Sequence, residues 1–286
     1  MKRYRTLSAP YMVWAVIFVL VPLGMIFYYG LTSAEGALTL ENFQKFFAGN
    51  AAHTLVKSLR IAVISTLICF LLGYPMAYFM AKAHFRLRPA LLMLVVIPMW
   101  MNFLLRTYAW ITILSREGIL NTFLTGLGLS PVDLLYTETA VILGMVYNFL
   151  PFMILPIFTS LEKMDHSLLE AAADLGANHA QAFFHVTLPL SVPGILSGLS
   201  MVFIPAIATF EITSLLGGSK TNLIGNVIQQ QFTVTGNWHY GSAMAMVLLV
   251  FLVLSLIFGR EKGTHTQAAL ATPGEVEAGK EEVHHD

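Results

Sequence analysis

Between Leu168 and Pro189 the sequence reads LLEAAADLGANHAQAFFHVTLP, a polar segment in the middle of an otherwise very apolar chain. Ser167, the residue before it, and Glu170 have the S-x-x-E spacing of a capping box, in which two side chains satisfy free backbone N–H groups at a helix start. Gly176 stands where this helix would end, because glycine readily adopts the left-handed conformation of a helix C-terminus. The segment is therefore predicted to begin with a short helix that stops at a sharp turn.

A second short helix is predicted after this turn. Asn178 and Gln181 repeat the capping pattern. An apolar run follows them, and we expect the helix to stop before Pro189, because proline lacks the backbone N–H that continues a helix. The result is a helical hairpin within residues 161–190. It has three possible roles: a plain connector, an amphipathic surface for lipid, or a projection that binds another protein.

The charge of the hairpin favours a protein partner over lipid. A helix that lies on a membrane surface usually carries Lys and Arg opposite its apolar face. Residues 161–188 hold one lysine against four acidic side chains, which are Glu162, Asp165, Glu170 and Asp174. A socket on another protein therefore fits the hairpin better than anionic lipid does, while the connector role stays open.

The chain around the hairpin has the composition of an integral membrane protein. Of its 286 residues 56% are hydrophobic and 11% are charged, whereas roughly a quarter of a soluble domain is charged. Six runs reach the length of about 20 apolar residues that crosses a bilayer. They cover roughly residues 11–31, 58–80, 90–114, 138–160, 191–216 and 241–258. The predicted fold class is an all-α integral membrane protein with six transmembrane helices in contact with lipid.

The basic residues predict the orientation of this bundle. Lys and Arg near the ends of spans resist translocation, so they gather on the cytoplasmic side. With both termini inside, that side holds ten of the sixteen, which are Lys2, Arg3, Arg5, Lys82, Arg86, Arg88, Lys163, Arg260, Lys262 and Lys280. The loop AKAHFRLRP at 81–89 is the best support for this arrangement. An N-in, C-in bundle places the hairpin in the cytoplasm.

The six runs divide the chain into three parts. Residues 1–57 hold the first helix and an external loop. Residues 58–258 form a core of five helices and include the hairpin. Residues 259–286 are polar and poor in bulky side chains, which predicts a disordered cytoplasmic tail.

No catalytic or metal site is predicted, and the chain is not expected to be an enzyme. Cys69 is the single cysteine, so it can form no intrachain disulfide or multi-cysteine metal site. The sequence GGSKT at 217–221 resembles a phosphate-binding loop, but Ser219 separates Gly218 from Lys220 and no strand precedes it. The sixteen basic and sixteen acidic residues balance, which gives no support for a nucleic-acid partner. The chain is therefore expected to bind no cofactor and no ATP by itself.

The hairpin resembles the EAA loop of permease subunits in binding-protein-dependent ABC importers. The matching residues are Glu170, Ala171, Ala172, Gly176, Val186, Leu188 and Pro189, with Val186 where the family usually has isoleucine. In that family the loop is the coupling helix that docks in a groove on a cytoplasmic ATPase, where its glutamate meets basic residues. The resemblance implies the type I permease fold. It also implies a dimer of ATP-binding subunits that holds ATP and magnesium, a second homologous permease and an extracytoplasmic solute-binding protein.

A second set of motifs is similar to the polyamine branch of that family. These motifs are Leu72–Pro75, Ile97–Asn102 with Arg106 and Tyr108, Gly118–Asn121, Leu215–Gly218 and Leu223–Ile228. They imply import of spermidine or putrescine across a bacterial inner membrane. One departure is Ala208-Thr209-Phe210-Glu211, in which the acid lies two places away from its position in many relatives. The role of that acid therefore does not carry over directly.

Polar and aromatic residues within the spans are candidates to line a solute pathway, because an ionisable group there is costly and usually faces a cavity or a partner. Glu211 is the foremost candidate, and its alternative is a neutral carboxyl bonded to a neighbouring helix. Five further candidates could offer ring faces or amide groups to an organic cation: Trp100, Asn102, Tyr108, Tyr147 and Asn148. The aromatic members are equally typical of membrane-boundary anchors. Arg106 is expected to reach the interface or to pair with Glu138 rather than to contact solute.

Three rival functions remain open. A secondary transporter or channel would work without an ATPase. A membrane-embedded enzyme would need a cluster of His, Asp or Glu in the spans, which the sequence does not provide. A related importer branch for another small organic solute is the closest alternative.

Overall fold

The computed structural model describes residues 13–165, 167–218 and 220–270, with side chains described as far as Leu256. Among these residues the regular secondary structure is helical, apart from one isolated β-bridge between Thr32 and Leu38. The elements in order are η1 (Val16–Leu20), α2 (Val21–Leu31), α3 (Glu41–Ala48), α4 (Asn50–Lys82), α5 (Arg88–Trp100), α6 (Phe103–Leu114), α7 (Ile119–Gly126), α8 (Glu138–Glu162), α9 (Ser167–Asp174), α10 (His179–Ala182), η2 (Phe183–Thr187), α11 (Leu188–Ala208), η3 (Thr213–Gly217), α12 (Ile224–Thr233) and α13 (Trp238–Leu270). The elements marked η are π-helical turns.

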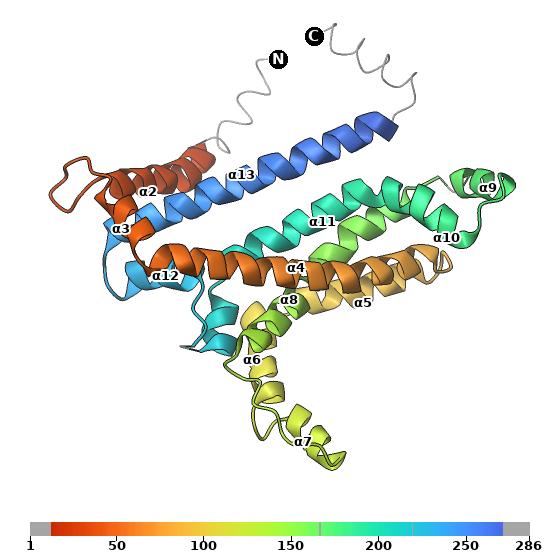
Figure 1. The fold of residues 1–286 in the computed structure, drawn as a ribbon, viewed down its shortest axis with the longest axis horizontal. Helices are drawn as coiled ribbons and strands as arrows, with labels where there is room; N and C mark the ends of the chain where they lie inside the picture. The colour runs from red at the N-terminus through yellow and green to blue at the C-terminus, as the bar shows by residue number, and fades with distance from the viewer. Residues whose placement is uncertain (1–12, 166, 219, 271–286) are drawn as a thin grey trace, which may run out of the picture.

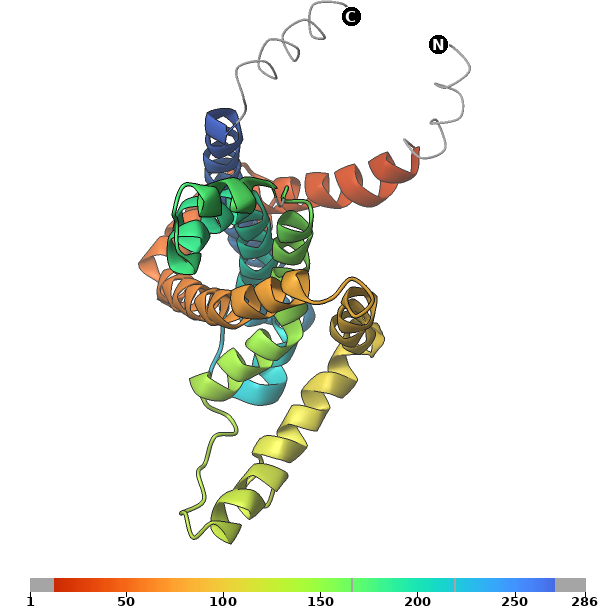
Figure 2. The same ribbon diagram turned by 90° about the vertical axis from the view of Figure 1, so that its right-hand side faces the viewer.

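The long helices run side by side and the shorter elements gather at their ends (Figure 1). Helices α4, α8 and α11 pack against one another, and α13 packs against α2 and α11. The hairpin of α9 and α10 lies at one end of this bundle, and α3 and α12 lie at the other. Helices α6 and α7 project to one side, as the turned view in Figure 2 also shows.

Small residues allow the central helices to approach closely. A Cβ atom added to Gly194 on α11 would lie 2.5 Å from the Ser160 Cβ and 2.7 Å from the Pro156 carbonyl oxygen on α8. Close backbone approach at small residues is typical of helix packing in membranes, where van der Waals contact rather than water exclusion holds helices together. The core of the bundle therefore lies along the contacts of α4, α8 and α11.

Five helices are long and apolar enough to span a membrane, and a bent pair makes a sixth candidate. The five are Val13–Leu31, Asn50–Lys82, Glu138–Glu162, His179–Ala208 and Trp238–Leu256, and the bent pair joins Arg88–Trp100 to Phe103–Gly126 at 91°. The all-α membrane fold is confirmed. The prediction of one continuous span over 90–114 is wrong, because the helix breaks between α5 and α6.

Local chemistry explains this break. Pro98 lies in the last turn of α5 and has no backbone N–H to give to the helix. Asn102 then caps α6, because its side-chain oxygen accepts the N–H groups of Leu104 at 2.8 Å and Leu105 at 3.4 Å. An N-cap residue is itself non-helical, so the chain changes direction there.

The predicted run over 191–216 is also shorter than expected, since α11 ends at Ala208. Thr209 is extended, with ψ 138°. The start of α12 then fits against the end of α11: a Cβ atom on Gly225 would lie 2.5 Å from the Ala208 carbonyl oxygen. The long helix therefore stops at Ala208, and the chain turns before the separate π-helical turn η3 at Thr213–Gly217.

The predicted domain limits are shifted by helix lengths. Helix α4 begins at Asn50, so the boundary expected between residues 57 and 58 falls inside it. Helix α13 continues to Leu270, so residues 259–270 are helical where a disordered tail was predicted. Residues 271–286 of that tail lie outside the described residues.

Candidate functional site

The turn of the hairpin closes with a regular helix-ending motif. Gly176 has φ +82°, as the sequence predicts. Its N–H donates to the Ala173 carbonyl at 2.9 Å, and the Ala177 N–H donates to the Ala172 carbonyl at 3.0 Å. These two bonds form a Schellman motif, which needs a left-handed residue four places beyond the acceptor alanine. The spacing from Ala172 to Gly176 is therefore fixed by backbone geometry.

The second capping prediction is confirmed and the first is wrong. The side chains of Asn178 and Gln181 each accept the other's backbone N–H at 2.9 Å. At the start of α9 the carboxylate of Asp165 accepts the Ser167 N–H at 2.9 Å, so Ser167 is already inside the helix. Among the described residues, the side chains of Ser167 and Glu170 form no capping box. Asp165, two residues before Ser167, therefore caps the start of α9 in place of Ser167.

The second helix of the hairpin does not stop before Pro189, contrary to the prediction. The chain is helical without interruption over His179–Ala208. The π-helical turn Phe183–Thr187 explains this, since the Leu188 N–H donates to the Phe183 carbonyl, five residues back. A wider turn accommodates the proline ring and its missing N–H, which would disturb a regular α-helix. Leu188 and Pro189 therefore open α11, and the hairpin is one end of a continuous helical rod.

The tip of the hairpin exposes apolar side chains. Leu175, at the turn, is 90% exposed, and Leu168 and Phe184, nearer the base of the hairpin, are also exposed. The acidic side chain of Glu170 is exposed beside them. Apolar side chains rimmed by charge are characteristic of protein–protein contact sites. The hairpin therefore has the surface of a docking element.

The hairpin is held to the bundle at its base and is separated from it further out. The Phe183 ring makes edge contacts with the rings of Tyr74 and Tyr78 on α4, with centroids 5.9 and 5.4 Å apart. Beyond this contact lies a cavity of about 510 Å³, lined on one side by Lys82 and on the other by Glu170. This cavity therefore separates the outer part of the hairpin from α4.

Three predicted pathway residues lie around the break between α5 and α6. Trp100 ends α5 and is 84% exposed, and Tyr108 on α6 is half exposed. Asn102 is exposed, but its side-chain oxygen is engaged in capping α6. The sequence treated Asn102 as a solute contact and missed this structural role, for which an asparagine before an apolar run was the available signal.

The two candidates on α8 differ in exposure. Tyr147 is 40% exposed and meets the ring of Trp110 on α6 edge to face, with centroids 5.5 Å apart. Asn148 is buried, and its amide nitrogen donates to the Gly144 carbonyl at 2.9 Å. Its amide oxygen has no partner among the described residues. Trp110 was not among the predicted pathway residues, although it completes the aromatic contact between α6 and α8.

Glu211 lies just beyond the end of α11 and not within a span, which corrects its predicted position. It is half-buried, and it makes no ion pair or side-chain hydrogen bond with any of the described residues. The turn around it is fixed by Asn226, whose amide nitrogen donates to the Phe210 carbonyl at 3.0 Å and to the Ser214 hydroxyl at 2.7 Å. A carboxylate without a local partner therefore stands where the long helix stops.

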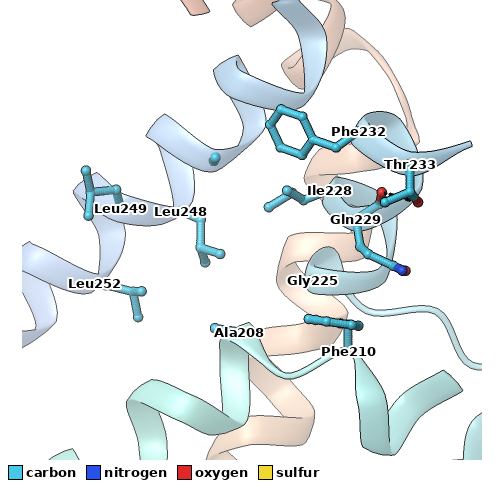
Figure 3. A pocket seen from close by; sticks show the side chains of 11 residues that line it. Ala208, Phe210, Gly225, Ile228, Gln229, Phe232, Thr233, Leu248, Leu249 and Leu252 are labelled. Carbon is cyan, nitrogen blue, oxygen red and sulfur yellow. Dashed lines mark hydrogen bonds between the residues drawn. The ribbon is translucent and has the colours of Figure 1, made fainter. Parts of the chain in front are cut away.

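An apolar cavity of about 410 Å³ opens beside this turn (Figure 3). Ala208 and Phe210 lie at its base, and Ile228 and Phe232 of α12 face Leu248 of α13 across it. Its few polar side chains give an organic cation little to bind. The elements that carry the polar candidates contact one another elsewhere. The η3 turn, which follows Glu211, packs against α6, which carries Tyr108, and against α8, which carries Tyr147 and Asn148.

The predicted pair of Arg106 with Glu138 is wrong. Glu138, at the start of α8, accepts from Lys57 at 2.9 Å and also from Arg60. Both cations come from α4, so this cluster ties the beginnings of two long helices together. Arg106 is buried, and its Nε atom has no hydrogen-bond partner among the described residues.

Comparison with known proteins shows the family to which this chain belongs. Residues 72–260 match the family described as "Binding-protein-dependent transport system inner membrane component". The chain is similar to the spermidine/putrescine transport system permease protein PotB of Haemophilus influenzae, with 45% identity over 86% of this chain and 88% of that protein. It is also similar to PotB of Escherichia coli, with 41% identity over 85% of this chain and 92% of that protein.

Solved structures agree on the fold. A chain of a bacterial ABC transporter that imports the acidic polysaccharide alginate superposes with a TM-score of 0.79 at 20% identity, covering 92% of this chain and 96% of its own. A chain of the MetNI methionine ABC transporter gives a TM-score of 0.57 at 16% identity, covering 75% and 95%. The hairpin, the apolar helices and these similarities lead to one conclusion: this chain is a multi-pass bacterial inner-membrane protein that belongs to the family of inner membrane components of binding-protein-dependent transport systems.

Proposed function

We propose that this chain is a permease subunit of an ATP-driven importer that carries spermidine or putrescine across the inner membrane. The observation that carries the proposal is the Schellman-closed hairpin with an exposed apolar tip, in a chain whose relatives at 41–45% identity are named as spermidine/putrescine permeases. The partners are a dimer of cytoplasmic ATP-binding subunits, an extracytoplasmic solute-binding protein and a second homologous permease. ATP and magnesium belong to the ATP-binding subunits, and this chain catalyses no reaction.

The helical rod His179–Ala208 supports a direct route for coupling. One end of the rod is the hairpin that would contact the ATPase, and the other end is the turn that carries Glu211. A helix transmits displacement along its axis because its backbone hydrogen bonds resist stretching. Closure of the ATPase dimer would therefore move the surroundings of Glu211 by moving the hairpin, which is the kind of rigid-element shift that alternating access uses.

We also propose the N-in, C-in orientation, which places the hairpin and the basic loop 81–89 in the cytoplasm. Reporter domains fused after Lys82 or Lys163 are expected to be cytoplasmic, and a reporter after Lys220 external, because Lys and Arg favour the cytoplasmic side. The measurement is paired reporters that are active on opposite sides of the membrane. An external reporter after Lys163 would remove the hairpin from the ATPase and contradict the coupling route.

The break between α5 and α6 supports a pathway in this region. Irregular backbone at membrane depth is stable only where protein covers it or where it lines a water-filled cavity. Met101, at the break, is more than half exposed in the single chain, and Trp100 beside it is almost fully exposed. Broken helices of this kind supply solute sites in many transporters. In the proposed pathway the ring faces of Trp100 and Tyr108 attract the cationic solute.

The projecting helices α6 and α7 supply the contact with the second permease in this proposal. Leu105 and Phe123 are both well exposed, and α7 carries no charged residue. A helix that lies on a lipid surface usually has Lys and Arg on its outer face. Protein therefore covers these two helices better than lipid headgroups do, and a second homologous permease would also cover the break.

A photoreactive label on a single cysteine tests this contact. Phe123→Cys in a Cys69→Ala background is expected to yield an adduct with the second permease in the assembled complex. The matched control is Phe47→Cys on α3, which is similarly exposed at 68%. Equal yields at the two positions, or label recovered from Phe123→Cys in lipid alone, would contradict the placement.

Uptake by right-side-out membrane vesicles, with ATP enclosed and the binding protein outside, tests the transport proposal itself. Vesicles that contain this chain with its partner subunits and binding protein are expected to accumulate labelled spermidine or putrescine only when ATP is supplied on the cytoplasmic side. Accumulation of a different organic solute would point to the related importer branch. Accumulation without any ATP-binding subunit would point to a secondary transporter.

A further inference from the structure

Arg106 is a largely buried arginine whose Nε atom has no hydrogen-bond partner and which pairs with no acid among the described residues. It lies on α6, one turn beyond the break, and is only 8% exposed. Its nearest aromatic contact is a long one, with the guanidinium carbon 5.9 Å from the centroid of the Phe103 ring. A buried charge is stable only with a counter-charge or hydrogen bonds, so this side chain needs an acid or another acceptor in some state of the protein.

The acids at this end of the bundle leave one candidate. Glu138 is already bound by Lys57 and Arg60. Other acids at this end are exposed on loops or on the short helix α3, and these are Glu35, Glu41, Glu117 and Asp133. Glu211 is the remaining acid, half-buried and without a partner among the described residues. Among the described residues of this region, the guanidinium of Arg106 and the carboxylate of Glu211 are therefore the two unpaired charges that are at least partly buried, whereas the unpaired Lys220, Glu35 and Glu117 are exposed.

Arg106 and Glu211 belong to elements that touch. The η3 turn begins two residues after Glu211 and packs against α6, which carries Arg106. Both elements also pack against α8. In the structure described here the two side chains form no ion pair. The helical rod His179–Ala208 ends three residues before Glu211, so a movement of the rod would be passed to the turn that carries this carboxylate.

We propose that Arg106 is the resident counter-ion of Glu211. In the solute-free closed state of the transport cycle the guanidinium pairs with the carboxylate, and an ammonium group of the solute replaces it when the pathway opens. This inference rests on the proposed import of a polyamine. It explains why a pathway for a cation keeps a cation of its own: the arginine balances the charge of the carboxylate between cycles and gives up its place to the solute. No bond is made or broken, and one cation is exchanged for another.

The exchange accounts for the choice of arginine. A guanidinium is always protonated, and it binds a carboxylate through two parallel N–H groups. A lysine at this position would be a point charge that loses its proton more readily when buried. Arg106→Lys keeps a positive charge and is therefore expected to retain part of the uptake activity. Arg106→Met is expected to lose selectivity for cationic solutes, because the charge of Glu211 then has no counter-charge between transport cycles.

Cross-linking tests the pair without any solute. Cys69 is the single cysteine of this chain and is buried, so Cys69→Ala removes its native thiol, and the complex without introduced cysteines shows the background from the partner subunits. In the assembled importer, Arg106→Cys with Glu211→Cys is expected to react with a short bifunctional thiol reagent at least tenfold more in one nucleotide state than in the other. The control pair, Arg106→Cys with Glu138→Cys, is expected to stay uncross-linked because Glu138 belongs to the cluster with Lys57 and Arg60. Absence of cross-linking in both the nucleotide-free and the ATP-trapped complex would overturn the proposal.

Charge reversal supplies the second measurement. Arg106→Glu and Glu211→Arg are each expected to lower uptake tenfold or more, and the double variant is expected to recover part of that loss, because the pair is restored with its charges exchanged. A double variant no better than the worse single variant would contradict the pair. A state-dependent cross-link in a complex that imports no polyamine would keep the pair and reject the solute instead. Polyamine import with normal kinetics in Arg106→Met would keep the solute and reject the pair.

Discussion

Replacing Glu170 with arginine is expected to abolish uptake while the permease stays in the membrane. Glu170 is exposed on the hairpin, on the wall of the cavity that separates the hairpin from α4, and it makes no hydrogen bond or ion pair with any of the described residues, so the substitution breaks no such contact. The resemblance to the EAA loop implies a basic groove on the ATPase, and like charges facing each other across an interface cost several kcal/mol. A loss of about 2–4 kcal/mol in docking corresponds to roughly 30- to 1,000-fold weaker coupling. The measurement is uptake together with solute-stimulated ATP hydrolysis by the assembled complex.

The turn of the same hairpin provides an independent variant. Gly176→Val places a β-branched residue at φ +82°, where open space surrounds it but the backbone conformation disfavours any side chain. The expected strain is about 1–2 kcal/mol, localised in the hairpin. Gly36→Val is the matched control, because Gly36 has φ +81° and equally open surroundings on a loop at the other end of the bundle.

The two variants and their controls separate coupling from folding. Glu35→Arg reverses an exposed acid far from the hairpin and is expected to leave uptake unchanged. Normal solute-stimulated hydrolysis in the Glu170→Arg complex would reject the docking role. Equal losses in Gly176→Val and Gly36→Val would assign the effect to general strain rather than to the hairpin.

The sequence predicted those parts of the fold that depend on neighbouring residues. The Asn178–Gln181 cap and the left-handed Gly176 are local signals, and both are present in the structure. The π-helical turn before Pro189 is different, because a proline can end a helix or can be absorbed by a wider turn. Packing of Phe183 on Tyr74 and Tyr78 favours the continuous helix, and that contact joins segments about a hundred residues apart.

The hydropathy of a segment measures its composition and does not show whether the helix in it is continuous or changes direction. The run 90–114 is apolar throughout, so a window of about 20 residues reads it as one span. The break at Asn102 depends on a single capping side chain after a proline. The same limit affected the end of α11 at Ala208, where apolar residues continue into a separate turn.

The sequence was least able to predict which acidic and basic side chains pair with each other. Arg106 and Glu138 seemed suited to each other because both lie near the outer ends of spans. In the structure Lys57 and Arg60, one turn apart on α4, both reach Glu138. The choice among competing cations depends on which helices are neighbours, and α4 packs along α8 far more extensively than α6 does. That information is tertiary, and a single sequence without relatives does not contain it.

The second large effect is expected at Glu211, where Glu211→Gln should lower polyamine uptake by about tenfold or more. A polyamine carries at least two positive charges, and its passage through a low-dielectric bundle requires compensating charge or carbonyl dipoles. Glu211 is half-buried at the end of the helical rod and lacks a partner among the described residues, so its charge is free to act on a solute. Glutamine keeps the size of the side chain and removes only the charge, and a loss of about 1.4 kcal/mol in solute stabilisation corresponds to that tenfold change.

Basal ATP hydrolysis and assembly of the Glu211→Gln complex are expected to persist, because the hairpin is untouched and no ion pair is broken in the described structure. Glu35→Gln is the control, since it removes one exposed acid from the loop between α2 and α3 and leaves α6, η3 and the break between α5 and α6 unchanged. The measurement is the initial rate of spermidine and putrescine uptake in a strain that lacks other polyamine importers. The carboxylate should matter more for spermidine, which carries the larger charge, so the loss is expected to grow with the charge of the solute. An equal loss for charged and neutral solutes would show that residue 211 supports the turn rather than the cation, and unchanged uptake would remove Glu211 from the pathway altogether.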